Sequence, residues 1–189
     1  MAPRRHVLYT IGHSTRTYAE LVTALRAWEV STLVDIRHFT RSRANPQFNA
    51  TALRRRLPRA DIEYVELREL GGRRSRSKTV PPQRNAGWTN AAFKNYADYA
   101  ESAEFAAGLD ALLERATRSV CAIMCAEVLW WRCHRRIVAD YAMARGLTVN
   151  HIFTPTKIER AKRTPFAKLD QKTRTLRYPR PRTKSSRTT

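Results

Sequence analysis

Acidic side chains are scarce in this sequence. Its 189 residues include 16 Asp and Glu against 36 Lys and Arg, which gives a formal net charge of +20 with neutral histidines. This excess favours a polyanionic partner such as DNA or RNA over an acidic small molecule alone. A charge that serves only to solubilise the protein is the alternative.

Long hydrophobic runs and a disulfide framework are also missing. No stretch of about 18 apolar residues occurs, which excludes a transmembrane helix, and the opening residues MAPRRHVLYTIGHS lack the apolar segment and cleavage site of a secretory signal. The three cysteines are odd in number and too few to staple a chain of this size, so free thiols in a reducing compartment are expected. We therefore predict a soluble, cytoplasmic protein with no membrane partner. Its oligomeric state is not specified by the sequence.

Short apolar segments alternate with helical patterns through most of the chain. With 42% apolar residues, the chain can bury one sizeable core. Strands are predicted at residues 6–11, 31–36, 62–67, 120–124 and 148–153. Helices are predicted after the capping-box sequence Thr17–Glu20, at 50–57, near 90–99 and 105–113, and from Cys133 to a C-cap at Gly146. This alternation predicts an α/β fold, with one three-layer domain (residues 6–154) whose largely parallel sheet is flanked by helices.

Residues 155–189 have a different composition. They contain 12 Lys or Arg against two acids, Glu159 and Asp170, and few large apolar groups. Because so little surface is available for burial to offset chain entropy, we predict a basic, disordered tail that contacts a phosphate backbone. Residues 37–84, with 13 Lys or Arg against four acids, form a second basic region.

Polar clusters follow four of the predicted strands. They are Gly12-His13-Ser14, Asp35-Ile36-Arg37, Gly71-Gly72 and Cys125-Ala126-Glu127, and a fifth, Cys133-His134-Arg135, opens the next helix. Since the carboxyl ends of parallel strands face one crevice, these clusters are expected to converge. The helix start adds unpaired N–H groups and a dipole that favour an anion. The sequence therefore predicts a polar pocket at this edge of the sheet.

The residue types indicate roles within this pocket. The catalytic candidates are Glu127 as general acid or base, with His13, Asp35 and Cys125. The candidate substrate or anion contacts are Gly12, Ser14, Arg37, Arg43, Gly71, Gly72, Cys133, His134 and Arg135. Guanidinium groups and the nearby Phe39 and Phe48 suit phosphates and stacked bases. We therefore predict a nucleic-acid- or nucleotide-binding enzyme that acts on a base or a phosphate group, with no cofactor specified.

Three alternatives stay open. Metal binding would use His13, Asp35, Cys125, Cys133 and His134, but the C-x7-C-H spacing matches no familiar short zinc pattern, and no metal ligand is assigned. Thiol chemistry at Cys125 is the second, although Arg132 follows one residue too late for a C-x5-R phosphatase loop. Either would make a metal- or thiol-dependent enzyme for a small soluble substrate. The third is a non-catalytic DNA- or RNA-binding module in which Arg37, Glu127 and Arg135 form an internal ion-pair network.

Five segments of the chain resemble one known family. In chain order, TIGHSTR, VDIRHFTRSRANPQF, LGGRR, GWTNAAFKNYADY and CAEVLWWRCHRRIVAD resemble the motifs of the domain-of-unknown-function family 488. The resemblance spans residues 8 to about 153, and the chain has Phe39-Thr40 where that family usually shows a proline. It implies a compact α/β domain with a shared polar pocket and names no substrate.

Overall fold

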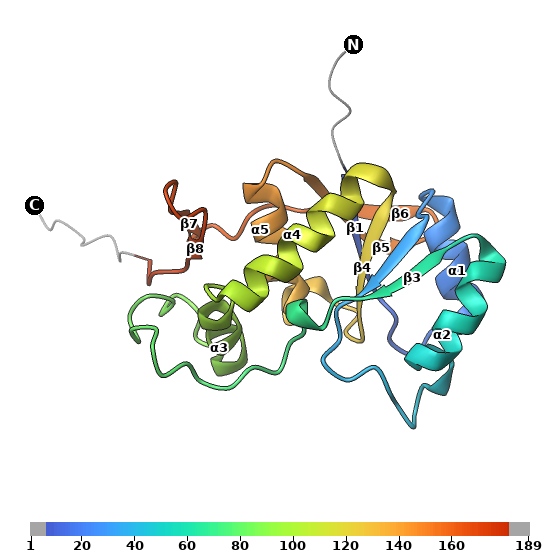
Figure 1. The fold of residues 1–189 in the computed structure, drawn as a ribbon, viewed down its shortest axis with the longest axis horizontal. Coiled ribbons are helices and arrows are strands. Elements are labelled where there is room, and N and C mark those ends of the chain that lie inside the picture. The colour runs from blue at the N-terminus through green and yellow to red at the C-terminus, as the bar shows by residue number, and fades with distance from the viewer. Residues whose placement is uncertain (1–6, 182–189) are drawn as a thin grey trace, which may run out of the picture.

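A six-stranded, mostly parallel sheet forms the centre of the protein (Figure 1). The computed structural model describes residues 7–181. The strands are β1 (Val7–Gly12), β2 (Thr32–Asp35), β3 (Glu63–Glu66), β4 (Cys121–Cys125), β5 (Thr148–Thr154) and β6 (Lys157–Arg160). They lie in the order β3-β2-β4-β1-β5-β6, and only β6 runs antiparallel to its neighbour. The five predicted strands and the largely parallel sheet are confirmed.

The register of the sheet aligns the ends of its central strands. Gly12 at the end of β1 is paired with Cys125 at the end of β4, and Asp35 at the end of β2 is paired with Met124. The carboxyl ends of β1, β2 and β4 therefore meet at one edge, which lies at the bottom of the sheet in Figure 1. The loop after β2 extends beyond this edge before it enters the next helix.

Helices cover both faces of the sheet. The helices are α1 (Tyr18–Ala27), α2 (Ala50–Arg56), α3 (Ala91–Tyr99), α4 (Ala103–Arg118) and α5 (Arg135–Ala144). In β2, Leu33 packs into the apolar cluster formed with α1 and α2, while the next residue, Val34, packs into the cluster formed with α3, α4 and α5. This alternation is what a sheet buried on both faces requires, and it confirms the predicted three-layer α/β fold. Within the described residues, none of the helices is both long and apolar enough to span a membrane.

Short 3₁₀ helices and caps shape the connections. The 3₁₀ helices are η1 (Pro46–Phe48), η2 (Leu57–Ala60), η3 (Arg68–Leu70) and η4 (Trp130–Arg132). The capping box predicted before α1 is present, since Thr17 Oγ1 accepts from Glu20 N at 3.2 Å and Glu20 Oε2 accepts from Thr17 N at 2.7 Å. Gly146, which follows α5, adopts φ +94°, a left-handed conformation that favours glycine and ends the helix.

The segment after β5 is folded, so the prediction of a disordered tail from residue 155 is wrong for residues 155–181. β6 pairs with β5, and β7 (Lys168–Leu169) pairs with β8 (Leu176–Arg177) in a small hairpin. Both Leu176 and Tyr178 have no exposed surface. The domain therefore extends well past residue 154, and the rest of the predicted tail, residues 182–189, lies outside the described residues.

A few inward-facing groups hold this segment in place. Tyr178 lies with its ring 5.3 Å from that of Trp88, its hydroxyl donates to Asp140 Oδ2 at 3.1 Å, and its backbone N–H donates to Asn85 Oδ1 at 2.9 Å. The hydroxyl of Tyr141 on α5 accepts from Leu176 N at 3.1 Å. Composition averaged over the segment hides these side chains, because the many charged residues around them face solvent.

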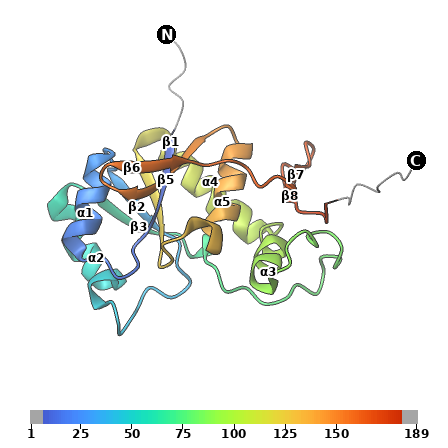
Figure 2. The ribbon, with the colours of Figure 1, turned by 180° about the vertical axis from the view of Figure 1, so that it is seen from behind.

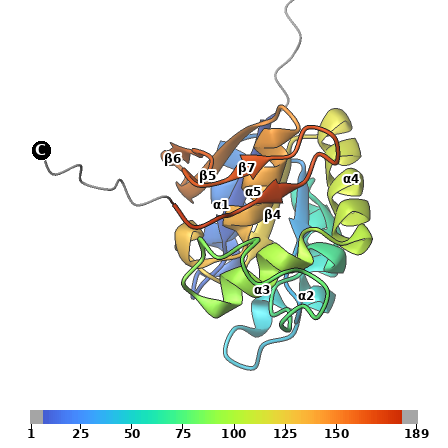
Figure 3. The same cartoon turned by 90° about the vertical axis from the view of Figure 1, so that its left-hand side faces the viewer.

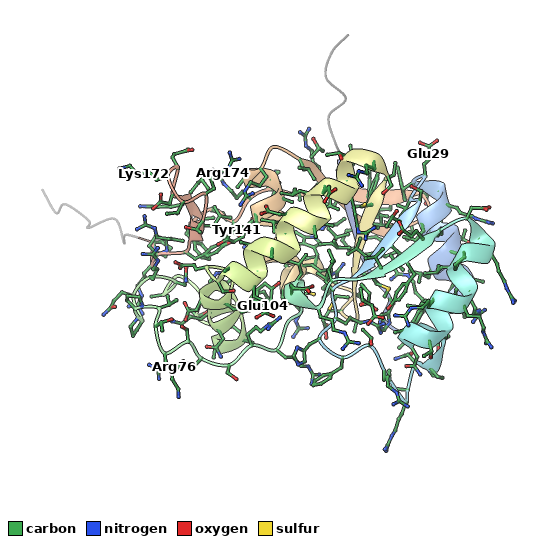
Figure 4. The ribbon with its side chains drawn as sticks, in the orientation of Figure 1. Glu29, Arg76, Glu104, Tyr141, Lys172 and Arg174 are labelled. Atoms are coloured by element: carbon green, nitrogen blue, oxygen red, sulfur yellow. The ribbon has the colours of Figure 1, made fainter. Side chains whose placement is uncertain are left out.

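The figures show the path of this segment. In Figure 2 it runs from β6 across the back of the sheet to β7 and β8, and in Figure 3 it passes over α5. Figure 4 labels Tyr141 between α4 and the β7–β8 hairpin, whereas Lys172 and Arg174 are labelled at the outer end of that hairpin. The segment is thus amphipathic, with a basic outer surface and an apolar inner one.

Candidate functional site

A cavity of about 540 Å³ lies at the carboxyl edge of the sheet. Its walls come from the residues after β1, β2 and β4, from the loop before α3, from α3 itself and from the residues just before α5. The lining residues are His13, Arg37, His38, Phe39, Arg41, Ser42, Asn45, Gly72, Arg73, Ala92, Phe93, Tyr96, Cys125, Ala126, Glu127, Arg132, Cys133 and His134. Segments far apart in sequence therefore meet where the strand-end clusters were expected to meet.

The predicted site residues divide into two groups. Those that line the cavity are His13, Arg37, Gly72, Cys125, Glu127, Cys133 and His134. Those that lie beside it without lining it, or away from it, are Gly12, Ser14, Asp35, Arg43, Gly71 and Arg135. Arg43 is exposed on the loop after β2, whereas Ser14, Asp35 and Arg135 hydrogen-bond to His13, Arg37 and Cys133 of the first group.

Asp35 and Arg37 form a buried ion pair behind the cavity. Arg37 Nη2 lies 2.5 Å from Asp35 Oδ2, Arg37 Nε donates to Oδ1 at 2.9 Å, and the Arg37 backbone N–H donates to Oδ1 at 3.0 Å. The hydroxyl of Tyr64 donates to Asp35 Oδ2 at 2.7 Å, and Arg37 Nη2 also donates to the carbonyl of Phe48 at 2.7 Å. Asp35 is fully buried and Arg37 is 4% exposed. Arg37 thus uses most of its donors inside the protein while it also lines the cavity, and its role as an anion holder stays a prediction.

His13 continues this network as a neutral imidazole. Its Nδ1 donates to the carbonyl of Ser14 at 2.9 Å, so the lone pair on Nε2 accepts from Arg37 Nη1 at 3.2 Å. Burial, together with the charge of Arg37, lowers the pKa of His13 from 6.5 to about 4. The ring also packs against Phe48, with centroids 4.3 Å apart. Both ring nitrogens are therefore engaged with Ser14 and Arg37, and the proton-transfer role of His13 stays a prediction.

Two thiols and an imidazole form a second cluster at the same edge. Cys125 ends β4, and Cys133 and His134 immediately precede α5. His134 Nδ1 lies 3.9 Å from Cys125 Sγ and 3.6 Å from Cys133 Sγ, and all three atoms lie within 4.8 Å of one another. His134 Nε2 donates to the carbonyl of Ile36 at 3.0 Å, which leaves the Nδ1 lone pair directed at the two sulfurs.

The two thiols differ in acidity. Burial alone would raise the pKa of Cys133, but the hydrogen bond from Cys125 and the neighbouring His134 and Arg135 hold it well below its usual range. The hydrogen bond to Cys133, with burial, raises the pKa of Cys125. Cys133 is therefore the more acidic of the two thiols.

Arg135 is a buried cation that supports the backbone of the site. It is 1% exposed, and its Nη2 donates to the carbonyls of Glu127, at 2.5 Å, and Val128, at 3.2 Å. Its Nε donates to Cys133 Sγ at 3.4 Å. The internal network proposed for a binding module is thus different in detail: Arg135 holds the peptide of Glu127, not its carboxylate, and Arg37 pairs with Asp35.

Two of the predicted glycines allow close approaches at the site. A Cβ added at Gly12 would collide with the carbonyl of Glu127, and one added at Gly72 would lie 2.8 Å from His134 Nδ1. Gly12 therefore lets the turn after β4 cross β1, and Gly72 lets the imidazole reach the sulfurs. Both contacts explain why glycine follows these strands.

The mouth of the cavity carries free positive charge and an exposed aromatic ring. Arg41, Arg73 and Arg132 line it, and none of them has a carboxylate partner among residues 7–181. Phe39 is 60% exposed, and the guanidinium of Arg73 lies 5.4 Å from its ring centroid. Glu127 is the one carboxylate among the lining residues, and it is exposed.

Sequence reasoning missed two tyrosines that support the site. Tyr64 binds Asp35, and Tyr96 packs its ring 5.0 Å from that of His134 while its hydroxyl donates to the Leu70 carbonyl at 2.6 Å. Parallel pairing of β2 with β3 places Leu33 beside Tyr64, on the face that Asp35 shares. The pairing of these two strands was therefore the feature from which the contact between Tyr64 and Asp35 could have been predicted. The signal available for Tyr96 was its place in GWTNAAFKNYADY, one of the five segments that resemble the family.

A second cavity, of about 590 Å³, lies between residues 81–84 and the β7–β8 hairpin. Two of its charged groups are already paired, Arg84 with Glu101 and Arg177 with Asp170. Neither cysteine nor histidine is among its lining residues. The carboxyl-edge cavity is therefore the candidate functional site.

These features define a class: an α/β protein with a mostly parallel sheet and a polar cavity at the carboxyl ends of its strands. The family model described as "Domain of unknown function DUF488" matches residues 17–142, which is more than half of the chain, so the protein belongs to that family. No curated protein and no solved structure matches the chain.

Proposed function

We propose that the protein is an enzyme that binds a nucleotide unit of DNA or RNA at the carboxyl-edge cavity and acts on its base or phosphate group. The observation that carries this proposal is the composition of the cavity: three guanidiniums without carboxylate partners and an exposed aromatic ring surround a carboxylate, two thiols and an imidazole. Binding groups and reactive groups thus share one space of about 540 Å³, a size typical of small-molecule sites.

The guanidiniums supply the binding part of the proposal. Arg41, Arg73 and Arg132 come from three separate loops, and each faces a cavity whose lining contains only one carboxylate, that of Glu127. Phosphate groups of a nucleic acid are the ligands that such a set of cations binds most strongly. The +20 net charge of the chain would add long-range attraction to the same kind of ligand.

Phe39 supplies a surface on which a base can stack. It is 60% exposed, beside Arg73 and in edge contact with His38, whose ring centroid lies 4.6 Å away. Stacking on an exposed ring contributes about 1–3 kcal/mol per base in single-stranded complexes. A single-stranded or flipped nucleotide is therefore the form that we expect to enter.

Glu127 is the group that we assign to proton transfer. It is the carboxylate of the cavity lining, its side chain is exposed, and its backbone is fixed by Arg135. His13, the other candidate for this role, is neutral and has both nitrogens hydrogen-bonded. Glu127 therefore acts alone as the base, and the Asp35–Arg37–His13 network forms the rigid wall behind it.

A salt titration tests the binding part. Fluorescence anisotropy with single-stranded DNA and RNA should give a linear fall of log affinity with log salt. Replacing Arg41, Arg73 and Arg132 together with alanine should reduce the slope by about 2–3, roughly one per lost phosphate contact. The control is Arg115→Ala with Arg118→Ala, at the end of α4, because these arginines already pair with Glu63 and Glu114. An equal change in both variants, or no binding by the wild type at low salt, would contradict the proposal.

A turnover screen tests the catalytic part. Wild type and Glu127→Gln would be compared on nucleotides and on modified or damaged DNA and RNA. Turnover by the wild type that Glu127→Gln loses, with binding and thermal stability retained, supports an enzyme. Binding without turnover on any substrate would instead support the non-catalytic module.

A further inference from the structure

We propose that Cys125, Cys133 and His134 form a mononuclear site for a divalent metal ion, best suited to Zn²⁺, with one coordination position open to the cavity. Sulfur and imidazole nitrogen are the ligands that zinc prefers in proteins, and a set of two cysteines and one histidine occurs in catalytic zinc sites. The inference stands on the geometry of these three residues and does not require that the cavity binds nucleic acid.

The distances between the ligand atoms fit a tetrahedral ion. With Zn–S near 2.3 Å and Zn–N near 2.0–2.1 Å, a tetrahedral ion holds its sulfur and nitrogen ligands about 3.6 Å apart. The separations from His134 Nδ1 are 3.6 Å to Cys133 Sγ and 3.9 Å to Cys125 Sγ. All three atoms lie within 4.8 Å of one another, so a single ion placed between them is within reach of all three.

The surroundings hold the ligands as outer-shell groups hold metal ligands. His134 Nε2 donates to the Ile36 carbonyl at 3.0 Å, which fixes the tautomer that leaves Nδ1 free to coordinate. The backbone N–H and Nε of Arg135 donate to Cys133 Sγ at 3.5 and 3.4 Å, bonds that stabilise a thiolate. Gly72 leaves the space beside His134 that any side chain would fill.

A buried thiol pair with redox chemistry would not need this arrangement. A disulfide between Cys125 and Cys133 uses neither an imidazole lone pair aimed at both sulfurs nor a carbonyl that sets its tautomer. The third ligand is therefore what favours a metal ion over a redox pair. C-x7-C-H does not reveal the site from sequence because its ligands come from the end of β4 and from the turn before α5, with η4 between them.

The site has an open side. All three residues line the cavity, and within residues 7–181 no further Cys, His, Asp or Glu joins the cluster. Three protein ligands with an open position are typical of catalytic zinc rather than structural zinc. Glu127 lines the same cavity two residues after Cys125, where it can accept a proton from a metal-bound water. This coupling to Glu127 rests on the proposed function, whereas the metal site does not.

Metal binding by the full-length protein tests the inference. The protein would be purified under reducing conditions, stripped with a chelator and titrated with Zn²⁺ or Co²⁺. We expect one ion per chain and, with Co²⁺, the charge-transfer absorption of thiolate ligands together with the visible bands of a tetrahedral ion. Cys125→Ser, Cys133→Ser and His134→Gln should each weaken Co²⁺ binding by more than about 100-fold, since even outer-shell changes cost about 10–100-fold.

The control variant is Cys121→Ser, which removes the third buried cysteine, at the opposite end of β4 and outside the cluster. It should keep one ion per chain and the wild-type spectrum. Absence of thiolate absorption from Co²⁺-treated wild type would overturn the inference, and so would wild-type stoichiometry in Cys133→Ser. Because the wild-type titration is decisive by itself, a ligand variant that fails to fold does not leave the question open.

The test of the metal site and the test of the proposed function can fail independently of each other. The Arg41, Arg73 and Arg132 triple variant should bind one Co²⁺ per chain with wild-type absorption even if it no longer binds nucleic acid. Conversely, a chain that binds DNA or RNA without any thiolate-to-cobalt band would refute the metal site alone.

Discussion

Two polar clusters lie at the same edge of the sheet, and they differ in whether their polar atoms have hydrogen-bond or ion-pair partners. The Asp35–Arg37–His13 network has a partner for each charged group, with further support from Tyr64 and Phe48. The cluster of Cys125, Cys133 and His134 brings three potential ligand atoms within 4.8 Å of one another and lines the cavity. The charged groups of the first cluster are therefore paired with one another, whereas the ligand atoms of the second can still bind a further group.

This difference distinguishes residues that stabilise the structure of the site from residues that can bind a ligand. A buried charge that has all its hydrogen bonds stabilises one geometry and has no capacity left for a ligand. Polar groups that lie close together but still lack a bonding partner are the ones that a ligand can bind. The predictions that follow test whether the two clusters really divide in this way, and they are ordered from the largest expected effect on stability to the smallest.

Asp35→Asn should destabilise the protein strongly. The variant leaves the guanidinium of Arg37 buried without a counter-charge, which costs about 3–5 kcal/mol when one partner of a buried pair is removed. The control is Glu114→Gln, because Glu114 pairs with Arg118 while both side chains are more than 60% exposed. That variant should lose no more than about 1 kcal/mol. Urea unfolding of both variants measures the two losses, and equal losses would mean that the buried pair is not the stronger support.

The stability of the protein should depend on the neutral state of His13. Because its pKa is about 4 in the folded chain and 6.5 otherwise, the unfolded state binds a proton first as pH falls. Stability from this group is complete above about pH 6.5 and is lost towards pH 4, by on the order of 3 kcal/mol. His13→Asn should therefore be less stable than wild type at pH 7.5, and the gap should narrow at pH 4.5.

Unfolding by urea at the two pH values measures that gap. His38→Asn, which changes an exposed histidine on the loop after β2, is the control and should differ little from wild type. A gap for His13→Asn that stays constant with pH would show that His13 is not held neutral by the fold.

Tyr64→Phe should have a smaller effect of the same kind. The change removes one hydrogen bond to the Asp35 carboxylate, of 2.7 Å, and leaves the ion pair intact. A hydrogen bond to a charged group contributes about 1.5–3 kcal/mol, and we expect a loss near the lower value because Tyr64 is only partly buried. Tyr18→Phe, on α1, is the control because it changes another half-buried tyrosine outside this network, and it should change the unfolding free energy by less than about 0.5 kcal/mol.

Glu127→Gln should leave stability within about 0.5 kcal/mol of wild type, because the carboxylate is exposed and the turn is held through its backbone by Arg135. Thermal unfolding followed by circular dichroism measures this directly. A loss comparable to that of Asp35→Asn would place Glu127 in the supporting network and remove it from the chemistry.

Much of the fold and part of the site followed from sequence pattern. Buried parallel strands such as Val120 to Met124 are continuous apolar runs, and the rule that their carboxyl ends share one edge is enough to bring His13, Cys125 and Glu127 together. What pattern could not provide was the pairing of side chains. Arg37 and Arg41 look alike in the sequence and both line the cavity, yet Arg37 is bound to Asp35 whereas Arg41 has no carboxylate partner among residues 7–181.

The metal ligands and the C-terminal segment show two further limits. Convergence of Cys125, Cys133 and His134 depends on how η4 turns the chain, which no spacing rule describes. For residues 155–181, disorder was wrongly predicted because the prediction rested on the average composition of the segment. The charge of Lys172 or Arg174 says nothing about a neighbour such as Leu176 that faces inward. Two or three buried side chains decide whether such a segment folds.

The burial of Tyr178 also has a consequence for how the chain folds during its synthesis. Asp140 on α5 and Trp88 before α3 are both covered by a side chain that the ribosome adds much later than either. While the chain is being synthesised, α5 can form, but this part of the interior stays wet until residue 178 has emerged. A nascent chain released before that point would expose Trp88 and a buried carboxylate to water, and we expect it to be recognised by chaperones and proteases as unfinished.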